Sequence, residues 1–137
     1  KTIEDYCEKG QIPIIPSYTI VDDGGRQGLN VNADVAATEV AKQLQANKLV
    51  FVSEVNGVRT DPNDPNSMID TLTAAEAREL LASGAIVGGM IPKIESCLKT
   101  IERGVEKIHI INGRLKHSLL LEIFTSQGVG TQIIDQK

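Results

Sequence analysis

Two segments that lead into predicted helices carry the side chains best suited to binding a charged ligand. In the first, residues 28–41 (GLNVNADVAATEVA), a short extended stretch runs directly into an alanine-rich helix. Alternate residues of a strand share a face, so Asn30 and Asn32 place two carboxamides on one side. Asn32 is also a favourable helix N-cap, and Asp34 falls in the first turn, near the positive end of the helix dipole. A capped helix with an acidic first turn and a solvated Asn30 is the simpler interpretation of the same residues.

The second segment is residues 88–93 (GGMIPK), where two glycines precede another predicted helix. Glycines let a ligand approach the backbone closely, and the free N–H groups of a helix N-terminus bind anions. Lys93 lies in the first turn, where the dipole disfavours a cation. A phosphate held between Lys93 and the backbone amides explains this position, and a solvated lysine is the alternative. The segment matches neither a Walker A motif nor a GxGxxG fingerprint.

Other polar residues give weaker indications of chemistry. Residues 54–57 (EVNG) follow a predicted buried parallel strand, at the edge of an α/β sheet where nucleotides bind, although a plain turn explains them equally well. His109 alternates with Ile108 and Ile110, so it faces away from them and fits a structural role. No serine or cysteine stands beside a histidine in a nucleophile motif. No cluster of His, Cys and carboxylates predicts a metal held by the protein.

The composition is that of one ordinary globular domain. The chain has 137 residues, of which 41% are hydrophobic and 23% are charged, and its net charge is −4. This length and apolar content suffice for a core, and the acidic balance without a basic run argues against nucleic acid as a partner. No apolar stretch approaches the roughly 20 residues that span a bilayer. The two cysteines, Cys7 and Cys97, form no metal-binding pattern and fit a reducing, cytoplasmic compartment.

Predicted strands and helices alternate along the chain. Helices are expected over about 1–9, 33–46, 73–83, 90–105 and 117–126, and strands over 12–16, 18–21, 27–31, 48–55, 107–112 and 131–134. Asp22 to Gly25 (DDGG) predicts a hairpin turn, and residues 59–67 form a turn-rich loop. This order predicts an α/β fold, a three-layer αβα sandwich with a mainly parallel central sheet.

Five segments together resemble acetylglutamate kinase, a member of the amino acid kinase family. They are residues 30–34 (NVNAD), 49–58 (LVFVSEVNGV), 88–93 (GGMIPK), 109–114 (HIINGR) and 128–131 (GVGT). The NxNAD segment distinguishes this resemblance from aspartokinases, glutamate 5-kinases and uridylate kinases. The resemblance implies ATP-dependent phosphorylation of the side-chain carboxylate of N-acetyl-L-glutamate, in arginine biosynthesis. Such a transfer depends on positioning and charge neutralisation more than on a protein nucleophile.

The resemblance also implies roles for individual residues. Asn30 and Asn32 would bind the acetylglutamate, Lys93 would stabilise charge on the transferring phosphoryl group, and Asp34 would organise the lysine. ATP, arriving with Mg²⁺, would be bound by a larger set. That set is Ser53, Glu54, Val55, Asn56, Gly57, Gly88, Gly89 and Met90. Relatives usually carry aspartate at the position of Glu54, and the longer acid here would shift that contact with the nucleotide.

The C-terminal part resembles the members of this family that arginine inhibits. His109, Glu122 and Gly128 would line a site for L-arginine, since a carboxylate suits a guanidinium group. The resemblance further implies a homo-oligomer in the full-length protein and, in some relatives, binding of the signalling protein PII. It implies a cytoplasmic location, or the organellar stroma in a plant or alga, with no nucleic acid or membrane partner.

We expect residues 1–137 to be a single domain that corresponds to the C-terminal, ATP-binding half of such a kinase. The glycine-rich phosphate loop, its lysine and the arginine that grips the substrate would then belong to a preceding half. This chain alone would bind ATP without useful turnover, because each missing charge contact costs about 10²–10³-fold in rate. The alternatives are a non-catalytic module that binds arginine or nucleotide, and a kinase of the same family with another acceptor.

Overall fold

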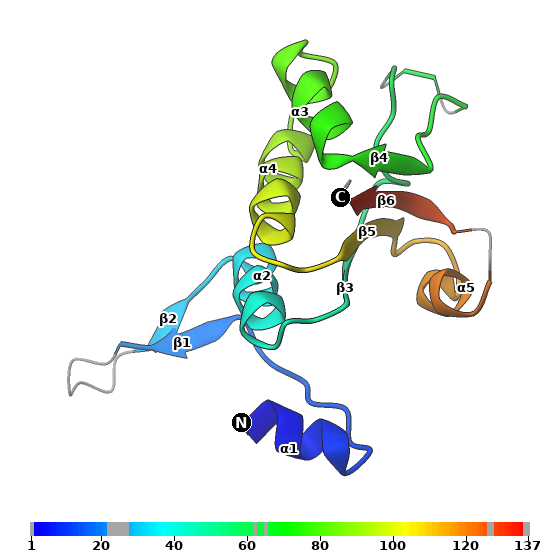
Figure 1. The fold of residues 1–137 in the computed structure, drawn as a ribbon. Coiled ribbons are helices and arrows are strands. Elements are labelled where there is room, and N and C mark those ends of the chain that lie inside the picture. The colour runs from blue at the N-terminus through cyan, green and yellow to red at the C-terminus, as the bar shows by residue number, and fades with distance from the viewer. Residues whose placement is uncertain (1, 22–27, 62, 65, 126–127, 136–137) are drawn as a thin grey trace.

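A four-stranded mixed sheet forms the centre of the computed structural model, which describes residues 2–21, 28–61, 63–64, 66–125 and 128–135 (Figure 1). The strand order is β3-β5-β6-β4. Strand β5 pairs in parallel with β3 and antiparallel with β6, and β6 pairs in parallel with β4. Their bounds are Lys48–Ser53 for β3, Thr71–Thr73 for β4, Lys107–Asn112 for β5 and Gly130–Ile134 for β6. The predicted mainly parallel sheet is confirmed, with one antiparallel pair.

Helices cover both faces of this sheet. The alternation along β5 separates the two faces: Ile108 and Ile110 join the core with Ile94 of α4, whereas His109 contacts Glu122 of α5. Helices α2, α3 and α4 therefore lie on one face and α5 on the other, which confirms the three-layer arrangement (Figure 1). Their bounds are Ala33–Gln43 for α2, Ala74–Ala82 for α3, Met90–Ile101 for α4 and Ser118–Phe124 for α5.

Local signals in the sequence place the helix starts. The side chain of Thr73 accepts a hydrogen bond from the Glu76 N–H at 3.1 Å, and the Glu76 carboxylate accepts one from the Thr73 N–H at 2.8 Å. This reciprocal capping box fixes the start of α3, as predicted. Ile94 and Cys97 of α4 are fully buried, because they follow the helical period of its apolar stripe. Full burial of the Ile94 side chain contributes about 1.5–3 kcal/mol to the free energy of folding.

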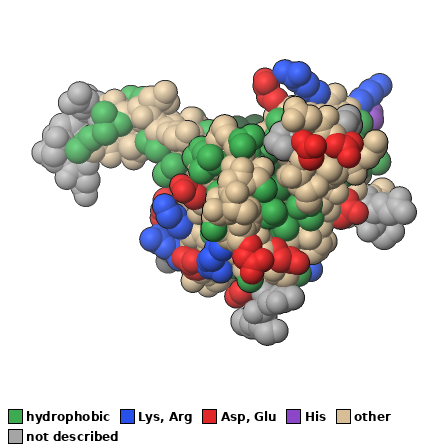
Figure 2. All heavy atoms as spheres, turned by 90° about the horizontal axis from the view of Figure 1, so that it is seen from above, with side chains coloured by type: hydrophobic (Ala, Val, Ile, Leu, Met, Phe, Trp, Pro, Cys, Tyr) green, Lys and Arg blue, Asp and Glu red, His purple; other side chains and the backbone are tan. Residues whose placement is uncertain are grey.

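The N-terminal part lies outside the sheet. Helix α1 (Thr2–Glu8) is followed by a hairpin of β1 (Tyr18–Ile20) and β2 (Gly28–Asn30), which projects from the body of the molecule (Figures 1 and 2). The predicted turn at residues 22–25 lies outside the described residues. The strand predicted at residues 12–16 is wrong: the segment belongs to no helix or strand, and Pro13 and Pro16 each lack a backbone donor.

Other elements also differ from expectation. Helix α2 ends at Gln43 instead of continuing to residue 46, because Gln45 adopts a left-handed conformation with φ +48°. Strand β4 was missed, since Thr73 was interpreted only as a helix cap. Strand β3 is parallel as predicted, but it stops at Ser53 and forms an edge of the described sheet, with Phe51 its one fully buried residue. In the part of the chain that the structure describes, no helix is both long and apolar enough to cross a membrane.

Candidate functional site

A cleft of about 340 Å³ opens where β3 and β5 end. Because the two strands are parallel and Ser53 is paired with Asn112, their carboxyl ends reach the same edge of the sheet. Ligands bind at this edge in open α/β sheets. The lining comes from the loop after β3 (residues 54–59), the segment before α4 (residues 85–87) with the first residue of α4 (Met90), and the end of β5 (Asn112) with Arg114 after it.

Hydrogen bonds join the two loops that follow the strands. The side-chain amide of Asn112 donates to the side-chain oxygen of Asn56, and the Gly113 N–H donates to the Ser53 carbonyl at 2.8 Å. At the mouth of the cleft, Arg114 donates from Nη2 to Oε2 of Glu54 at 3.1 Å. That last pair is highly exposed and contributes little to stability. The two loops thus form one connected wall of the cleft.

Gly57 lines the cleft in a backbone conformation that only glycine adopts readily. Its φ of +121° is a conformation that L side chains rarely adopt, and a Cβ there would come within 2.4 Å of Oγ1 of Thr131. The Val58 N–H next to it donates to the same hydroxyl at 2.7 Å, and that hydroxyl donates to the Ile69 carbonyl at 2.6 Å. Gly57 is therefore required by the fold, whatever it also contributes to a ligand.

The N-terminus of α4 borders this cleft through Met90. Gly88 has a φ of +59°, and Gly89 occupies the N-cap without a side-chain cap. A Cβ at either glycine would meet nothing within 4 Å, so the space beside this helix end is open. Pro92 in the first turn has no N–H to satisfy. The N–H groups of Met90 and Ile91 donate to the carbonyls of Val87 at 3.4 Å and Gly88 at 3.2 Å, so an anion beside this helix end would be attracted by the helix dipole and not by free backbone amides.

Lys93 and Asp34 form an ion pair between two helix starts. Nζ of Lys93 lies 2.6 Å from Oδ2 of Asp34, and the two side chains are 15% and 38% exposed. Asp34 is held in the first turn of α2 by the cap, in which Oδ1 of Asn32 accepts from the N–H groups of Asp34 at 2.9 Å and Val35 at 3.2 Å. The carboxylate offsets the cost of a cation at the N-terminus of α4.

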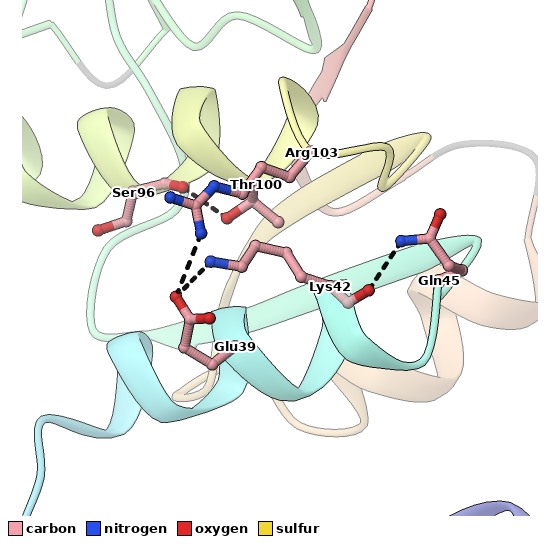
Figure 3. A network of polar contacts seen from close by, with 6 residues as sticks. All are labelled: Glu39, Lys42, Gln45, Ser96, Thr100 and Arg103. Carbon is pink, nitrogen blue, oxygen red and sulfur yellow. Dashed lines mark hydrogen bonds and ion pairs between the residues drawn. The ribbon is translucent and has the colours of Figure 1, made fainter.

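Contacts at the far ends of α2 and α4 keep the helices aligned (Figure 3). The buried Lys42 ammonium pairs with Oε1 of Glu39, and Nη1 of Arg103, just beyond α4, lies 3.8 Å from the same oxygen. Because Glu39 lies beyond Asp34 on α2 and Arg103 beyond Lys93, the two helices run side by side in the same direction. Their N-termini therefore meet on the side of the sheet where the cleft opens.

The structure unites only part of the predicted site. Glu54, Val55, Asn56, Gly57 and Met90 line the cleft. Among the residues described as lining it, several predicted ones are not found: Asn30, Asn32, Asp34, Ser53, Gly88, Gly89 and Lys93. Lys93 lies three residues after Met90 on α4, so its ion pair with Asp34 lies beside the cleft but does not line it. Asn30 is exposed at the end of β2, in the projecting hairpin.

The sequence interpretation missed other lining residues. Asn112 ends β5 and Arg114 follows it, and their place in the cleft was detectable from the Asn-Gly turn at the end of a strand parallel to β3. Residues 85–87 carry no side chain that suggests chemistry, so no local signal was available for them. Among the described residues, no group of three or more His, Cys, Asp or Glu is placed to hold a metal ion.

A second pocket, of about 660 Å³, lies on the α5 side of the sheet. It contains all three residues that the resemblance assigns to arginine, His109, Glu122 and Gly128. Nδ1 of His109 pairs with Oε1 of Glu122, and the Val129 N–H donates to Oε2 of the same carboxylate at 3.1 Å. The side chains of His109 and Glu122 are 8% and 4% exposed.

Burial dominates the protonation of His109. It lowers the pKa of this imidazole, and the charge of Glu122 opposes the shift without cancelling it. The imidazole is then neutral at pH 7, with Nδ1–H donating to Glu122. Its Nε2 is buried and has no hydrogen-bond partner among the described residues. His109 and Glu122 thus bring a carboxylate and an imidazole to the lining of this pocket, and a carboxylate suits a donor-rich cation.

Comparison with known protein families and curated sequences gives one consistent result. The model of the amino acid kinase family matches residues 1–112. An acetylglutamate kinase from Methanobrevibacter smithii is 51% identical over 131 residues, which are 96% of this chain and 44% of that protein. The acetylglutamate kinase of Synechococcus elongatus is 44% identical over 134 residues, 98% of this chain and 44% of that protein. The chain therefore spans less than half the length of these curated relatives.

Solved structures show the same fold. N-acetylglutamate synthase from Neisseria gonorrhoeae, complexed with coenzyme A and N-acetyl-glutamate, superposes with a TM-score of 0.87 at 30% identity, covering 99% of this chain and 30% of that one. Its complex with coenzyme A and L-arginine gives a TM-score of 0.83 and covers 97% and 30%. Carbamate kinase from Giardia lamblia, bound to AMP-PNP, gives 0.64 at 18% identity over 85% and 36%, which shows the fold alone.

Proposed function

Because the chain belongs to the amino acid kinase family, we propose that it supplies the nucleotide-binding half of an acetylglutamate kinase. In this reaction the γ-phosphoryl group of ATP passes to the side-chain carboxylate of N-acetyl-L-glutamate, giving N-acetyl-L-glutamyl 5-phosphate and ADP. The observation that carries the proposal is Lys93, held by Asp34 at an open helix N-terminus beside the cleft at the carboxyl edge of the sheet. Identity of 44–51% to acetylglutamate kinases favours this acceptor, compared with 30% for the synthase.

The nucleotide would occupy the cleft, with its phosphates directed toward the start of α4. There Gly88 and Gly89 leave room for close approach, and Lys93 neutralises negative charge as the phosphoryl group transfers. Asp34 orients the ammonium. Mg²⁺ would arrive on the ATP phosphates and neutralise charge there. The carboxylate of Glu54, which Arg114 contacts at 3.1 Å, is a donor in the cleft of the kind that Mg²⁺ accepts.

The acceptor would bind on the side of α2. The Oδ1 of Asn32 is used by the helix cap, which leaves its amide N–H groups for a carboxylate or the acetyl carbonyl. Asn30 would contribute a second carboxamide. The remaining substrate contacts would come from a preceding half, as in a full-length kinase. Assembly as a homo-oligomer and binding of PII stay predictions from the resemblance.

A regulatory arginine site is the second proposal for this chain. We propose this because Glu122 places a carboxylate in the lining of the pocket beside His109, and a guanidinium group offers five donors to such a carboxylate. Gly128 keeps this pocket open, since a Cβ there would come within 3.2 Å of Oε2 of Glu122. The structural neighbour complexed with L-arginine supports the same ligand.

A coupled assay for ADP release tests the kinase proposal in the complete protein that carries this sequence. Turnover is expected with N-acetyl-L-glutamate, and not with L-glutamate, L-aspartate or UMP. Turnover with glutamate but not acetylglutamate would reject the acceptor. Calorimetric titration then separates the alternatives: heat from L-arginine in a protein that turns over none of the four acceptors would favour a non-catalytic module.

A further inference from the structure

Phe51 is a buried aromatic residue directly beneath the lysine of the site. The four aromatic side chains of the chain all lie in its described part, and only Phe51 is buried, at 3% exposure. Tyr6, Tyr18 and Phe124 are 48%, 60% and 78% exposed. Nζ of Lys93 lies 5.0 Å from the centre of the Phe51 ring, which is within the range of a cation–π interaction.

The fold determines this approach from both sides. Phe51 is paired with Ile110 across β3 and β5, and both point into the core beneath the helices. On α4, Lys93 lies one helical turn before the fully buried Cys97, so its hydrocarbon stem runs between the helix and the sheet. Burial raises the pKa of the Cys97 thiol to about 12, so this neighbour stays neutral. The region around the ammonium is thus poorly solvated, and there a cation–π contact is strongest.

The ring and the carboxylate hold the ammonium in different ways. Asp34 takes one of the three N–H donors and neutralises part of the charge. The face of an aromatic ring attracts the cation through its quadrupole and removes no charge. A lysine held by Asp34 alone would move toward the carboxylate and lose part of its attraction for a phosphate. A ring beneath it opposes that movement and leaves the other donors available.

We propose that Phe51 is a positioning residue, whose ring fixes the Lys93 ammonium so that its remaining donors are directed at the transferring phosphoryl group. This inference rests on the proposed kinase function. No sequence signal pointed to it, because Phe51 is also an ordinary β-forming residue in an apolar strand.

The first test is spectroscopic and independent of activity. In the complete protein that carries this sequence, NMR should show the Hε protons of Lys93 shifted upfield from those of an exposed lysine, because they lie over the ring. The shift should vanish in Phe51→Leu and persist in Phe124→Leu, the control at the exposed phenylalanine. Lys93 protons at exposed-lysine positions in a folded chain would overturn the contact.

The second test is kinetic and uses the complete protein. Phe51→Leu should lower kcat about tenfold and leave KM for MgATP nearly unchanged, since the ring acts on charge that develops during transfer. Should Leu disturb folding, fluorinated phenylalanines at residue 51 preserve the shape of the ring while weakening its negative face. kcat should then fall stepwise with the number of fluorines at residue 51, and not at residue 124.

The possible outcomes distinguish a failure of the proposed role of Phe51 from a failure of the proposed kinase function. A series without any trend in kcat, in an enzyme that Lys93→Ala inactivates, rejects the role of Phe51 and leaves the kinase proposal intact. An upfield shift that responds to Phe51→Leu, in a protein that fails to phosphorylate acetylglutamate, rejects the function instead.

Discussion

Two pairs, each of a basic side chain with a carboxylate, lie on opposite faces of one sheet and differ in exposure. Lys93 and Asp34 are partly exposed, join two helix starts and adjoin the cleft at the strand ends. His109 and Glu122 are almost fully buried between β5 and α5. The first pair places an ammonium group beside an open helix end. The second contains an imidazole whose pKa is lowered by burial.

The difference shows how burial selects the ligand that a polar pair attracts. A charged ammonium at a helix N-terminus adds to the positive end of the dipole and attracts anions such as phosphates. A buried carboxylate beside a neutral imidazole attracts a cation with many donors. The sheet thus separates a proposed anion site on one face from a proposed cation site on the other.

Removal of Lys93 is expected to have the largest effect. Lys93→Ala in the complete protein should lower kcat by about 10²–10³-fold, because a preorganised positive charge is lost. Its stability should change little, since the pair is partly exposed. Lys99→Ala, at an exposed position on the same helix, is the control and should keep the rate. Steady-state kinetics and thermal unfolding measure both quantities, and an unchanged kcat would make this pair merely structural.

Substitution of two glycines of the proposed nucleotide site by alanine should affect different properties, stability at one position and MgATP binding at the other. Gly57→Ala should cost about 3 kcal/mol of stability, because its φ is positive and its Cβ would meet Thr131. Gly89→Ala should leave stability unchanged, since Gly89 has helical angles and open space around it, but should weaken binding of MgATP. Urea unfolding and calorimetry separate the two effects. Normal MgATP affinity in Gly89→Ala would place the phosphates elsewhere.

Loss of the buried carboxylate should affect arginine and not ATP. Glu122→Gln should weaken L-arginine binding about tenfold to hundredfold, since hydrogen bonds to a charged group are worth about 1.5–3 kcal/mol. Glu79→Gln, at an exposed position on α3, should bind arginine normally. Calorimetric titrations with L-arginine and with MgATP provide the measurement. If MgATP affinity fell instead, the assignment of the two faces would be reversed.

The smallest expected effect is a dependence of stability on pH. The pKa of His109 is lower in the folded chain than in the unfolded chain, so the unfolded state binds more protons below about pH 6.5. The free energy of unfolding should therefore fall as pH decreases from 6.5, by no more than about 1.4 kcal/mol per pH unit for one proton. His109→Gln should flatten this dependence, whereas replacement of the exposed His117 with Asn should not. Urea unfolding at several pH values measures the slope, and equal slopes would show that His109 is not responsible.

The sequence by itself determined the local elements of the site. Asn32 caps α2, Thr73 and Glu76 start α3, and the apolar stripe of α4 faces the core, because each depends on residues within one or two helical turns. The parallel strands and their shared carboxyl edge also followed from the order of predicted elements. The family resemblance, and not spacing, added the role of Lys93 and the grouping of the residues around His109.

Only the tertiary structure decided which distant side chains meet. Asp34 and Lys93 are 59 residues apart in the chain, and the contact of Lys93 with Phe51 depends on how α4 crosses β3. The antiparallel pairing of β6 and the missed strand β4 likewise had no local signal. Periodicity states which face of an element is apolar, but strand register and helix packing place that face against a particular neighbour, and these depend on contacts along the whole chain.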